Sequence, residues 1–112
     1  MDKTTVGLTE DVVVYNGNTQ KKAKARIDTG AKSNSIDENL IKKLNIGKGD
    51  KTTIVKSSMG KAVRHVIMIE IELAGRKIKG RFTVADRSNL KYPILIGRNI
   101  LKNGFLIDPG KK

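Results

Sequence analysis

Short segments in which apolar and polar residues alternate are the feature that most constrains the fold of this chain. Between residues 63 and 73 the odd positions carry Val63, Ile67, Ile69, Ile71 and Leu73. Because successive side chains of a strand point to opposite faces, this spacing predicts a strand with one buried face. Ala74-Gly75 then predicts a turn into residues 78–84, where apolar and basic residues alternate again. The pattern is typical of an antiparallel β protein.

The first part of the chain shows the same pattern and places an aspartate at a strand end. Residues 11–15 are rich in valine, and Asn16-Gly17 is a dipeptide favoured in tight hairpin turns. Alanine and isoleucine alternate with lysine and arginine over residues 22–27. A hairpin is therefore expected to carry Asp28 at the end of its second strand.

One helix is predicted from about residue 37 to residue 44. Ser35 and Glu38 have the spacing of a capping box, and Gly47 can end the helix. The apolar residues Ile36, Leu40, Ile41 and Leu44 fall on one helical face.

Further strands are predicted on both sides of residues 57–61, which read as the tip of a hairpin, and near the end of the chain. Residues 92–96 are predicted to form an apolar strand. Because proline has no N–H to donate, Pro93 is expected at a sheet edge or at the start of the strand. A short helix at residues 100–102 and a last strand at residues 105–107 follow. The fold class is thus all-β, with one or two short helices.

Length and composition narrow the class of protein. The 112 residues, without repeat or linker, are expected to form a single domain with one core. No apolar stretch approaches the roughly 20 residues of a membrane span, and the first residues do not form a signal peptide, so a cytoplasmic protein without a membrane partner is expected. The absence of cysteine excludes thiol catalysis, disulfides and thiolate metal sites.

The Asp-Thr-Gly-Ala sequence at residues 28–31 is the sharpest chemical feature. A carboxylate can activate water, a neighbouring hydroxyl can hold the loop, and a glycine lets backbone and substrate approach closely. The tripeptide alone is also ordinary turn chemistry.

A second element, the Ile-Leu-Ile-Gly-Arg-Asn sequence at residues 94–99, supports the chemical interpretation. Together the two motifs resemble the retropepsins, in which an apolar segment ending in glycine packs across the Asp-Thr-Gly-Ala loop. The resemblance extends from about Val12 to Pro109. Residues 25–33, 92–98 and 105–110 are similar to the retropepsin-like family often labelled ATP-dependent zinc proteases and associated with RimK-type ligases.

This resemblance implies a closed β-barrel of the acid protease fold and an aspartic endopeptidase that works as a homodimer. Two carboxyl groups a hydrogen bond apart share one proton, so that one activates water and the other polarises the peptide carbonyl. The chain contains Asp-Thr/Ser-Gly only once, and Asp108-Pro109-Gly110 is no substitute. Each of two copies would therefore supply Asp28 at a two-fold axis, and the partners would be a second copy and a peptide or protein substrate.

The resemblance also implies roles for the neighbouring residues. Thr29 would bond across the dyad, Arg98 would tie the short helix to the dimer interface, and the other residues would line the cleft, support the loop or form a flap: Gly30, Ala31, Ile96, Gly97, Met59 and Gly60. Plainer alternatives stay open, since Thr29 can satisfy a turn, Arg98 can form a surface ion pair, and Met59 can make a loose apolar contact.

No cofactor is expected, in spite of the family label. One histidine without cysteine is a poor basis for a zinc site, and no phosphate-binding loop is present. Strand parity places His65 on the apolar face, where a hydrogen-bonded structural histidine is expected. Glu70 and Glu72 share one strand face and are expected to form a solvated edge.

Two other classes of function stay open, and the net charge of +12 is the reason for the first. A basic β-barrel could bind nucleic acid, although the chain has few aromatic rings for stacking bases and such binding leaves both motifs unexplained. A retropepsin-like module could also bind a peptide or a partner enzyme without hydrolysis, because catalytic residue types do not prove turnover. The charge itself would favour acidic or neutral peptides near a cleft.

Overall fold

A computed structural model describes residues 2–58 and 60–111, and in these residues the chain forms nine strands and two short helices. The strands are β1 (Thr4–Val6), β2 (Thr9–Asn16), β3 (Thr19–Ile27), β4 (Asn34–Asp37), β5 (Thr52–Ser57), β6 (Gly60–Leu73), β7 (Arg76–Ala85), β8 (Ile94–Ile96) and β9 (Phe105–Ile107). The helices are α1 (Glu38–Lys43) and α2 (Arg98–Leu101). Neither helix is long and apolar enough to cross a membrane.

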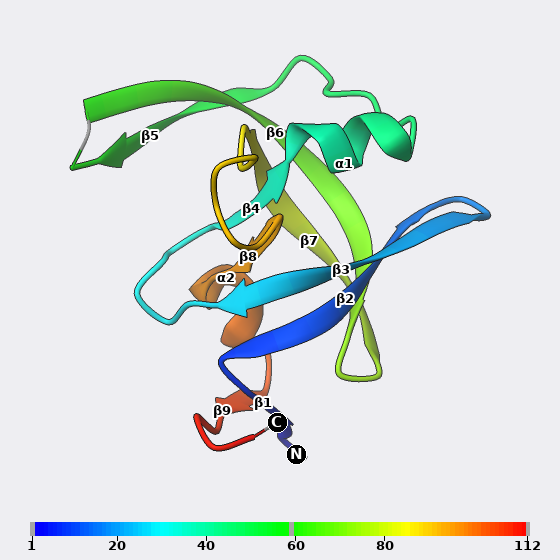
Figure 1. The fold of residues 1–112 in the computed structure, drawn as a ribbon, viewed down its shortest axis with the longest axis vertical. Helices are drawn as coiled ribbons and strands as arrows, with labels where there is room; N and C mark the ends of the chain where they lie inside the picture. Colours follow the sequence, from blue (N-terminus) through cyan, green and yellow to red (C-terminus); the bar gives the residue numbers. More distant parts are fainter. Residues whose placement is uncertain (1, 59, 112) are drawn as a thin grey trace.

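Strands β2, β3, β8, β4, β7 and β6 pair in that order, and β6 also pairs with β2, so that the sheet closes into a barrel (Figure 1). The predicted mainly β fold with a closed barrel and short helices is confirmed. Both hairpins predicted at Gly17 and at Ala74-Gly75 are present, with Asn16 opposite Thr19 and Leu73 opposite Arg76. Strand β8 lies between β3 and β4, so Pro93 precedes an interior strand and the edge alternative is wrong.

The barrel interior holds one apolar core, built from alternate residues of each strand. Burial of each large side chain contributes about 1.5–3 kcal/mol relative to exposure. The core side chains on the barrel strands are Val12, Val14, Ala25, Ile27, Ile36, Ile67, Ile69, Ile71, Leu73, Phe82, Val84, Ile94 and Ile96.

The β5–β6 hairpin extends beyond this core (Figure 1). Val63, expected on the buried face, is 69% exposed, because it lies opposite Ile54 in the hairpin, past the end of the barrel. His65 is partly buried, and its Nδ1 has no hydrogen-bond partner among the described residues, so the hydrogen bond expected for this histidine is not formed at Nδ1.

Helix α1 differs from its prediction at both ends. Ser35 is not a helix cap, because β4 continues to Asp37 and pairs with both β7 and β8. The N-cap is Asp37, whose carboxylate accepts the Arg87 N–H instead of a helical one. At the other end Asn45, not Gly47, adopts the left-handed conformation, and the N–H groups of Asn45 and Ile46 bond to Lys42 and Ile41 as in a Schellman motif.

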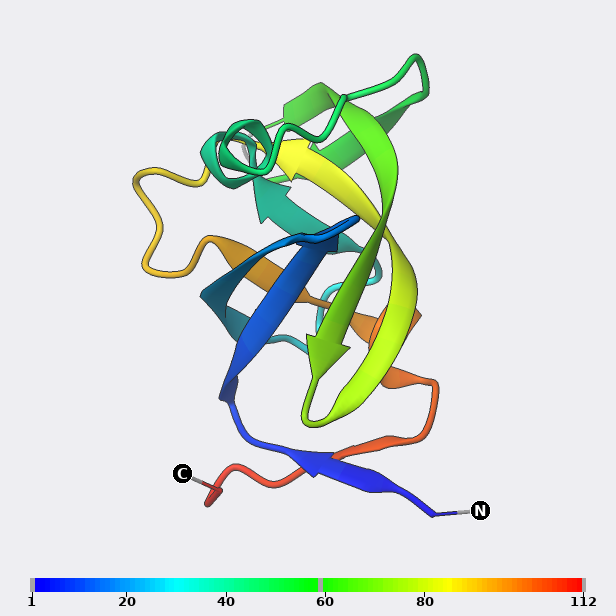
Figure 2. The same cartoon turned by 90° about the vertical axis from the view of Figure 1, so that its right-hand side faces the viewer.

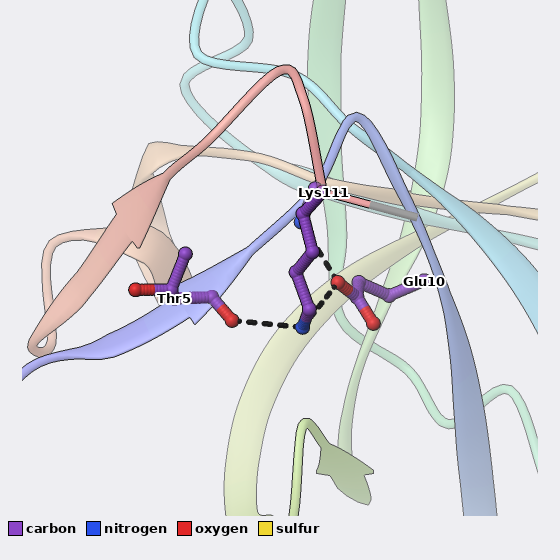
Figure 3. Close-up of polar contacts among 4 residues, drawn as sticks. Thr5, Glu10 and Lys111 are labelled. Atoms are coloured by element: carbon purple, nitrogen blue, oxygen red, sulfur yellow. Dashed lines mark hydrogen bonds and ion pairs between the residues drawn. The ribbon is translucent and has the colours of Figure 1, made fainter.

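The two chain ends form a small separate sheet below the barrel (Figure 2). Strand β1, which the sequence did not indicate, pairs in parallel with β9. The Nζ of Lys111 donates to the Thr5 carbonyl and to Oε2 of Glu10, at 2.9 Å each, and Oε2 also accepts the Gly7 N–H (Figure 3). A Cβ on Gly7 would lie 2.9 Å from the Lys111 carbonyl oxygen, so Lys111 packs directly against the turn between β1 and β2.

The turn at Ala74-Gly75 offers a test of backbone strain. Ala74 has φ of 51° and Gly75 has φ of 81°, the two positive values of a type I′ hairpin turn. The left-handed conformation costs a residue with a Cβ about 1–2 kcal/mol of conformational free energy, whereas glycine has no such cost. We expect Ala74→Gly to stabilise the fold by about 0.5–1 kcal/mol in thermal or urea unfolding.

The matched control is Ala62→Gly, inside β6, where glycine brings only its entropic cost. This variant is expected to be less stable than the unsubstituted chain. Destabilisation by both substitutions would contradict the strained turn.

Candidate active site

Asp28 lies directly after β3, at the point where β3 pairs in parallel with β8. Its N–H donates to the Ile96 carbonyl at 2.9 Å, which continues the β3–β8 pairing by one residue. Its Oδ1 accepts the Gly30 N–H at 2.9 Å, and its carbonyl accepts the Ala31 N–H at 3.3 Å. Asp28 as a residue is partly exposed, and one of its carboxylate oxygens is held by the turn.

The turn at Asp108 has the same local hydrogen bonds. Oδ1 of Asp108 accepts the Gly110 N–H at 2.9 Å, and its carbonyl accepts the Lys111 N–H at 3.0 Å. Asp108 is exposed and follows β9, at the terminal sheet. The Asp108 N–H also donates to the Val6 carbonyl at 2.8 Å, which continues the parallel β1–β9 pairing. Local turn chemistry and strand pairing therefore do not distinguish the two aspartates, whereas in the described part of the chain the Arg98 side chain and a groove lie only beside the Asp28 loop.

The segment from Gly97 to Asn99 braces the Asp28 loop. The N–H groups of Arg98 and Asn99 donate to the carbonyls of Ala31 and Lys32 at 2.8 and 3.1 Å. A Cβ at Gly97 would lie 2.5 Å from the Ser33 carbonyl oxygen and 2.7 Å from that of Ala31, so only glycine fits there. The structure thus brings residues 28–31 together with residues 96–98, which are far apart in the sequence.

Arg98 adds a side-chain contact to this brace. Its Nη1 donates to the Thr29 carbonyl at 2.9 Å. Within the described part of the chain it forms no ion pair, so the surface ion pair considered for Arg98 is absent there. Its predicted place at a dimer interface remains a prediction.

Asn34, which the sequence did not single out, joins this site to the barrel wall. Its side chain is fully buried, its Oδ1 accepts the Gly97 N–H at 2.8 Å, and its Nδ2 donates to the Arg81 carbonyl at 2.9 Å. Its own carbonyl accepts the Thr83 hydroxyl at 3.2 Å. An asparagine at the start of a short strand has no sequence signal for this role, because its partners are 47 or more residues away.

A groove of about 880 Å³ lies beside the loop. Gly30–Ser33 form one wall, the β5–β6 hairpin forms another, and the segment after β7, with Leu90, forms a third. The floor includes Ser35, Thr83 and Leu95, which lie side by side on neighbouring strands and face away from the core.

The groove is strongly basic. One carboxylate, that of Asp86, lines it among the described residues, together with six cationic side chains: Lys32, Lys56, Lys61, Arg64, Arg81 and Arg87. Lys56 and Lys61 lie directly opposite each other on β5 and β6. Like charges at such a pair are unfavourable and make the groove attractive to anions.

The segment after β7 is held in place by its polar groups. Hydrogen bonds from the Ser88 hydroxyl and N–H, at 2.6 and 3.0 Å, lower the pKa of the Asp86 carboxyl. Burial lowers the pKa of the Arg87 guanidinium, and the nearby Asp37 carboxylate partly offsets this effect. The Nε of Arg87 donates to the Tyr92 carbonyl at 3.0 Å, so this cation is anchored at the groove wall.

The other candidate residues lie as follows. Gly60 begins β6 and pairs with Ser57 at the end of the hairpin, whereas Met59 lies outside the described residues. Glu70 and Glu72 lie opposite Lys79 and Lys77, on a strand between β2 and β7, so the expected edge is wrong. Among residues 2–58 and 60–111, no three side chains of histidine, aspartate or glutamate gather as metal ligands would.

The close approach at Gly97 predicts a strict requirement for glycine. Gly97→Ala forces apart two backbone segments and is expected to cost about 1–3 kcal/mol of unfolding free energy in urea. Gly47→Ala is the control, because a Cβ there meets nothing within 4 Å and its φ is not positive. Equal stability of the two variants would contradict the observed packing.

The buried amide of Asn34 predicts a second large effect. Asn34→Leu keeps the branching and the number of heavy atoms but leaves the Gly97 N–H and the Arg81 carbonyl without this partner. The loss is expected to cost about 1–3 kcal/mol of unfolding free energy for each group. Asn39→Leu, on the exposed side of α1, is expected to change the urea midpoint little. A small change for Asn34→Leu would show that the amide is not a structural link.

Comparison with solved structures supports the fold over nearly the whole chain. The Legionella pneumophila protein Lpg0085, described as having unknown function, has a TM-score of 0.68 and 22% identity, over 97% of this chain and 95% of that one. The simian foamy virus (mac) protease has a TM-score of 0.62 and 18% identity, over 84% and 91% of the two chains. No curated protein matches the sequence.

A protein-family model also matches the chain. The model describes the RimB-like family, the retropepsin-like aspartic endopeptidase RimB, and it matches residues 48–112. The match contains the Ile94–Gly97 motif and the groove side of the β5–β6 hairpin, and it begins after the Asp28 loop. Since it covers more than half of the sequence, the chain belongs to the RimB-like family of retropepsin-like proteins.

Proposed function

We propose that the chain is one half of a homodimeric aspartic endopeptidase in which Asp28 of each copy activates water. The observation that carries this proposal is the bracing of the Asp28 loop by Ile96, Gly97 and Arg98 beside an open groove. Membership of the RimB-like family and the likeness in fold to a viral protease support it.

The mechanism follows from the shared proton of two facing carboxyl groups. The ionised Asp28 takes a proton from water while the oxygen attacks the peptide carbonyl carbon, and the neutral Asp28 of the second copy donates its proton to the carbonyl oxygen. The resulting diol collapses when the now protonated Asp28 gives its proton to the amide nitrogen, the other Asp28 takes the proton of one hydroxyl group, and the C–N bond breaks. The products are a carboxylic acid and an amine, and the dyad again holds one proton.

One chain cannot complete this site. Asp-Thr/Ser-Gly occurs once in the sequence, and the similar turn at Asp108 lies at the terminal sheet after β9. A second copy must therefore supply the second carboxylate, and a two-fold axis would pass between the Asp28 loops. Thr29, next to each aspartate, is exposed and could bond across this axis.

The groove favours extended peptides with acidic side chains. Its six cations face one carboxylate, and none of the three ion pairs among the described residues involves them. An extended peptide can pair with the backbone of a groove, while alternate side chains reach its walls. Acidic side chains would relieve the repulsion between Lys56 and Lys61.

The decisive variant is Asp28→Asn. An asparagine Oδ1 still accepts the Gly30 N–H, so the loop keeps its hydrogen bond while the acid is lost. We expect cleavage of a peptide library rich in glutamate and aspartate, from about pH 3 to 7, to fall at least about 100-fold.

Asp108→Asn is the matched control, because it changes the same atom in the same type of turn. It is expected to leave cleavage unchanged. Unchanged cleavage by Asp28→Asn would rule out Asp28 as the catalytic acid. The rate per chain should also fall on dilution, and a rate independent of chain concentration would exclude the dimer.

A binding module without hydrolysis is the second candidate. The observation that favours it is that one chain contains a single Asp-Thr-Gly motif, and thus one of the two catalytic carboxylates that hydrolysis needs. A chain that stays monomeric at micromolar concentration, binds acidic peptides and cleaves none would support this alternative. Strong binding to oligonucleotides with a steep dependence on salt would instead indicate a nucleic-acid partner.

A further inference from the structure

A second hollow, of about 450 Å³, lies next to the groove. The segment between α1 and β5 forms its wall with Ile46, Lys48 and Lys51, and Val66 and Met68 of β6 form its apolar floor together with Arg81 of β7. Met68 is 56% exposed, although neighbouring positions of β6 are buried.

The two hollows belong to one continuous surface. Val66 lies opposite Thr83, and Met68 lies opposite Arg81, so these residues share the face of β6 and β7 that points away from the core. Thr83 lines the groove, and Arg81 lines both hollows. Arg81 precedes Thr83 by two residues on β7, so the second hollow begins about 7 Å from this groove-floor residue.

Arg81 is a fixed point between the hollows. Its carbonyl accepts the Asn34 amide at 2.9 Å, and the same amide group binds the Gly97 N–H. The backbone of Arg81 is thus linked through one side chain to the brace of the Asp28 loop. Its guanidinium has no carboxylate partner among the three ion pairs that the described residues form.

We propose that the second hollow binds an apolar side chain of the same peptide that occupies the groove. This inference rests on the proposed function. Side chains two residues apart on an extended peptide are about 7 Å apart on one side, which matches the spacing of Thr83 and Arg81 on β7. In the bound peptide, an acidic side chain would lie beside the cationic Arg81, and an apolar side chain would pack on Val66 and Met68.

The continuity of the two hollows favours one peptide over two independent ligands. A single chain gains the second contact without a new loss of translational freedom. Asp50 also lines the second hollow, and Lys48 is paired with Glu38, but Lys51 and Arg81 have no ion pair among the described residues. These two charges suit a segment with acidic residues beside an apolar one.

Binding to the Asp28→Asn chain tests this site without turnover. The probes are fluorescent peptides of alternating glutamate and serine, extended at either end by Ser-Leu or by Ser-Ser. Only one end of the peptide can reach the second hollow. We therefore expect the peptide with Ser-Leu at that end to bind about five- to tenfold more tightly than the peptide with Ser-Ser there, as measured by fluorescence anisotropy. Adding Met68→Gln should reduce this ratio to below about twofold.

Leu8→Gln is the matched control, because Leu8 is a similarly exposed apolar residue (52%) that lines neither hollow. It should leave the leucine-to-serine ratio unchanged. Equal affinity for all peptides, or a ratio that Met68→Gln does not change, would overturn the second site.

Cleavage by the unsubstituted chain separates this inference from the proposed function. Leucine-dependent binding without cleavage would retain the second site and reject the endopeptidase. Cleavage with equal rates for leucine and serine peptides, together with equal affinities, would retain the endopeptidase and reject the second site.

Discussion

The close contact of two backbone segments at Gly97 is the constraint on which the site depends. The carbonyl groups of Ala31 and Ser33 occupy the space where a side chain at position 97 would lie. This contact allows Arg98 to hydrogen-bond the loop that begins at Asp28. The Asp28 carboxylate is therefore positioned by parallel β3–β8 pairing and by a glycine contact. The turn at Asp108 has corresponding features, with parallel β9–β1 pairing and a close contact between Gly7 and the Lys111 carbonyl, but it lines neither of the two hollows.

Asn34 extends this constraint to the wall of the barrel. A fully buried amide with both its oxygen and its nitrogen bonded costs little, whereas the same amide without partners would cost several kcal/mol. Its bonds to Gly97 and Arg81 connect the loop, the short β4 strand and the basic groove. Asn34 thus links the backbone of Arg81, a groove residue, to the Gly97 segment that braces the Asp28 loop.

Much of the fold could be predicted because its signals are local. The alternation over residues 63–73 reports which side of β6 is buried, and the turn residues report where the hairpins reverse. The prediction failed where tertiary pairing outweighed local preference. Ser35 has capping-box spacing, yet β4 gains partners on both sides from β7 and β8, and Val63 is exposed because the barrel ends before the hairpin does.

The sequence by itself determined the class of fold, the hairpin that ends at Asp28 and the second motif with Gly97, because each depends on the spacing of neighbouring residues. Only the tertiary structure decided which aspartate turn meets β8, that Asn34 bridges two strands, and that scattered lysines and arginines line one groove. Such contacts join residues up to about 70 positions apart, and no local pattern encodes the distance between them.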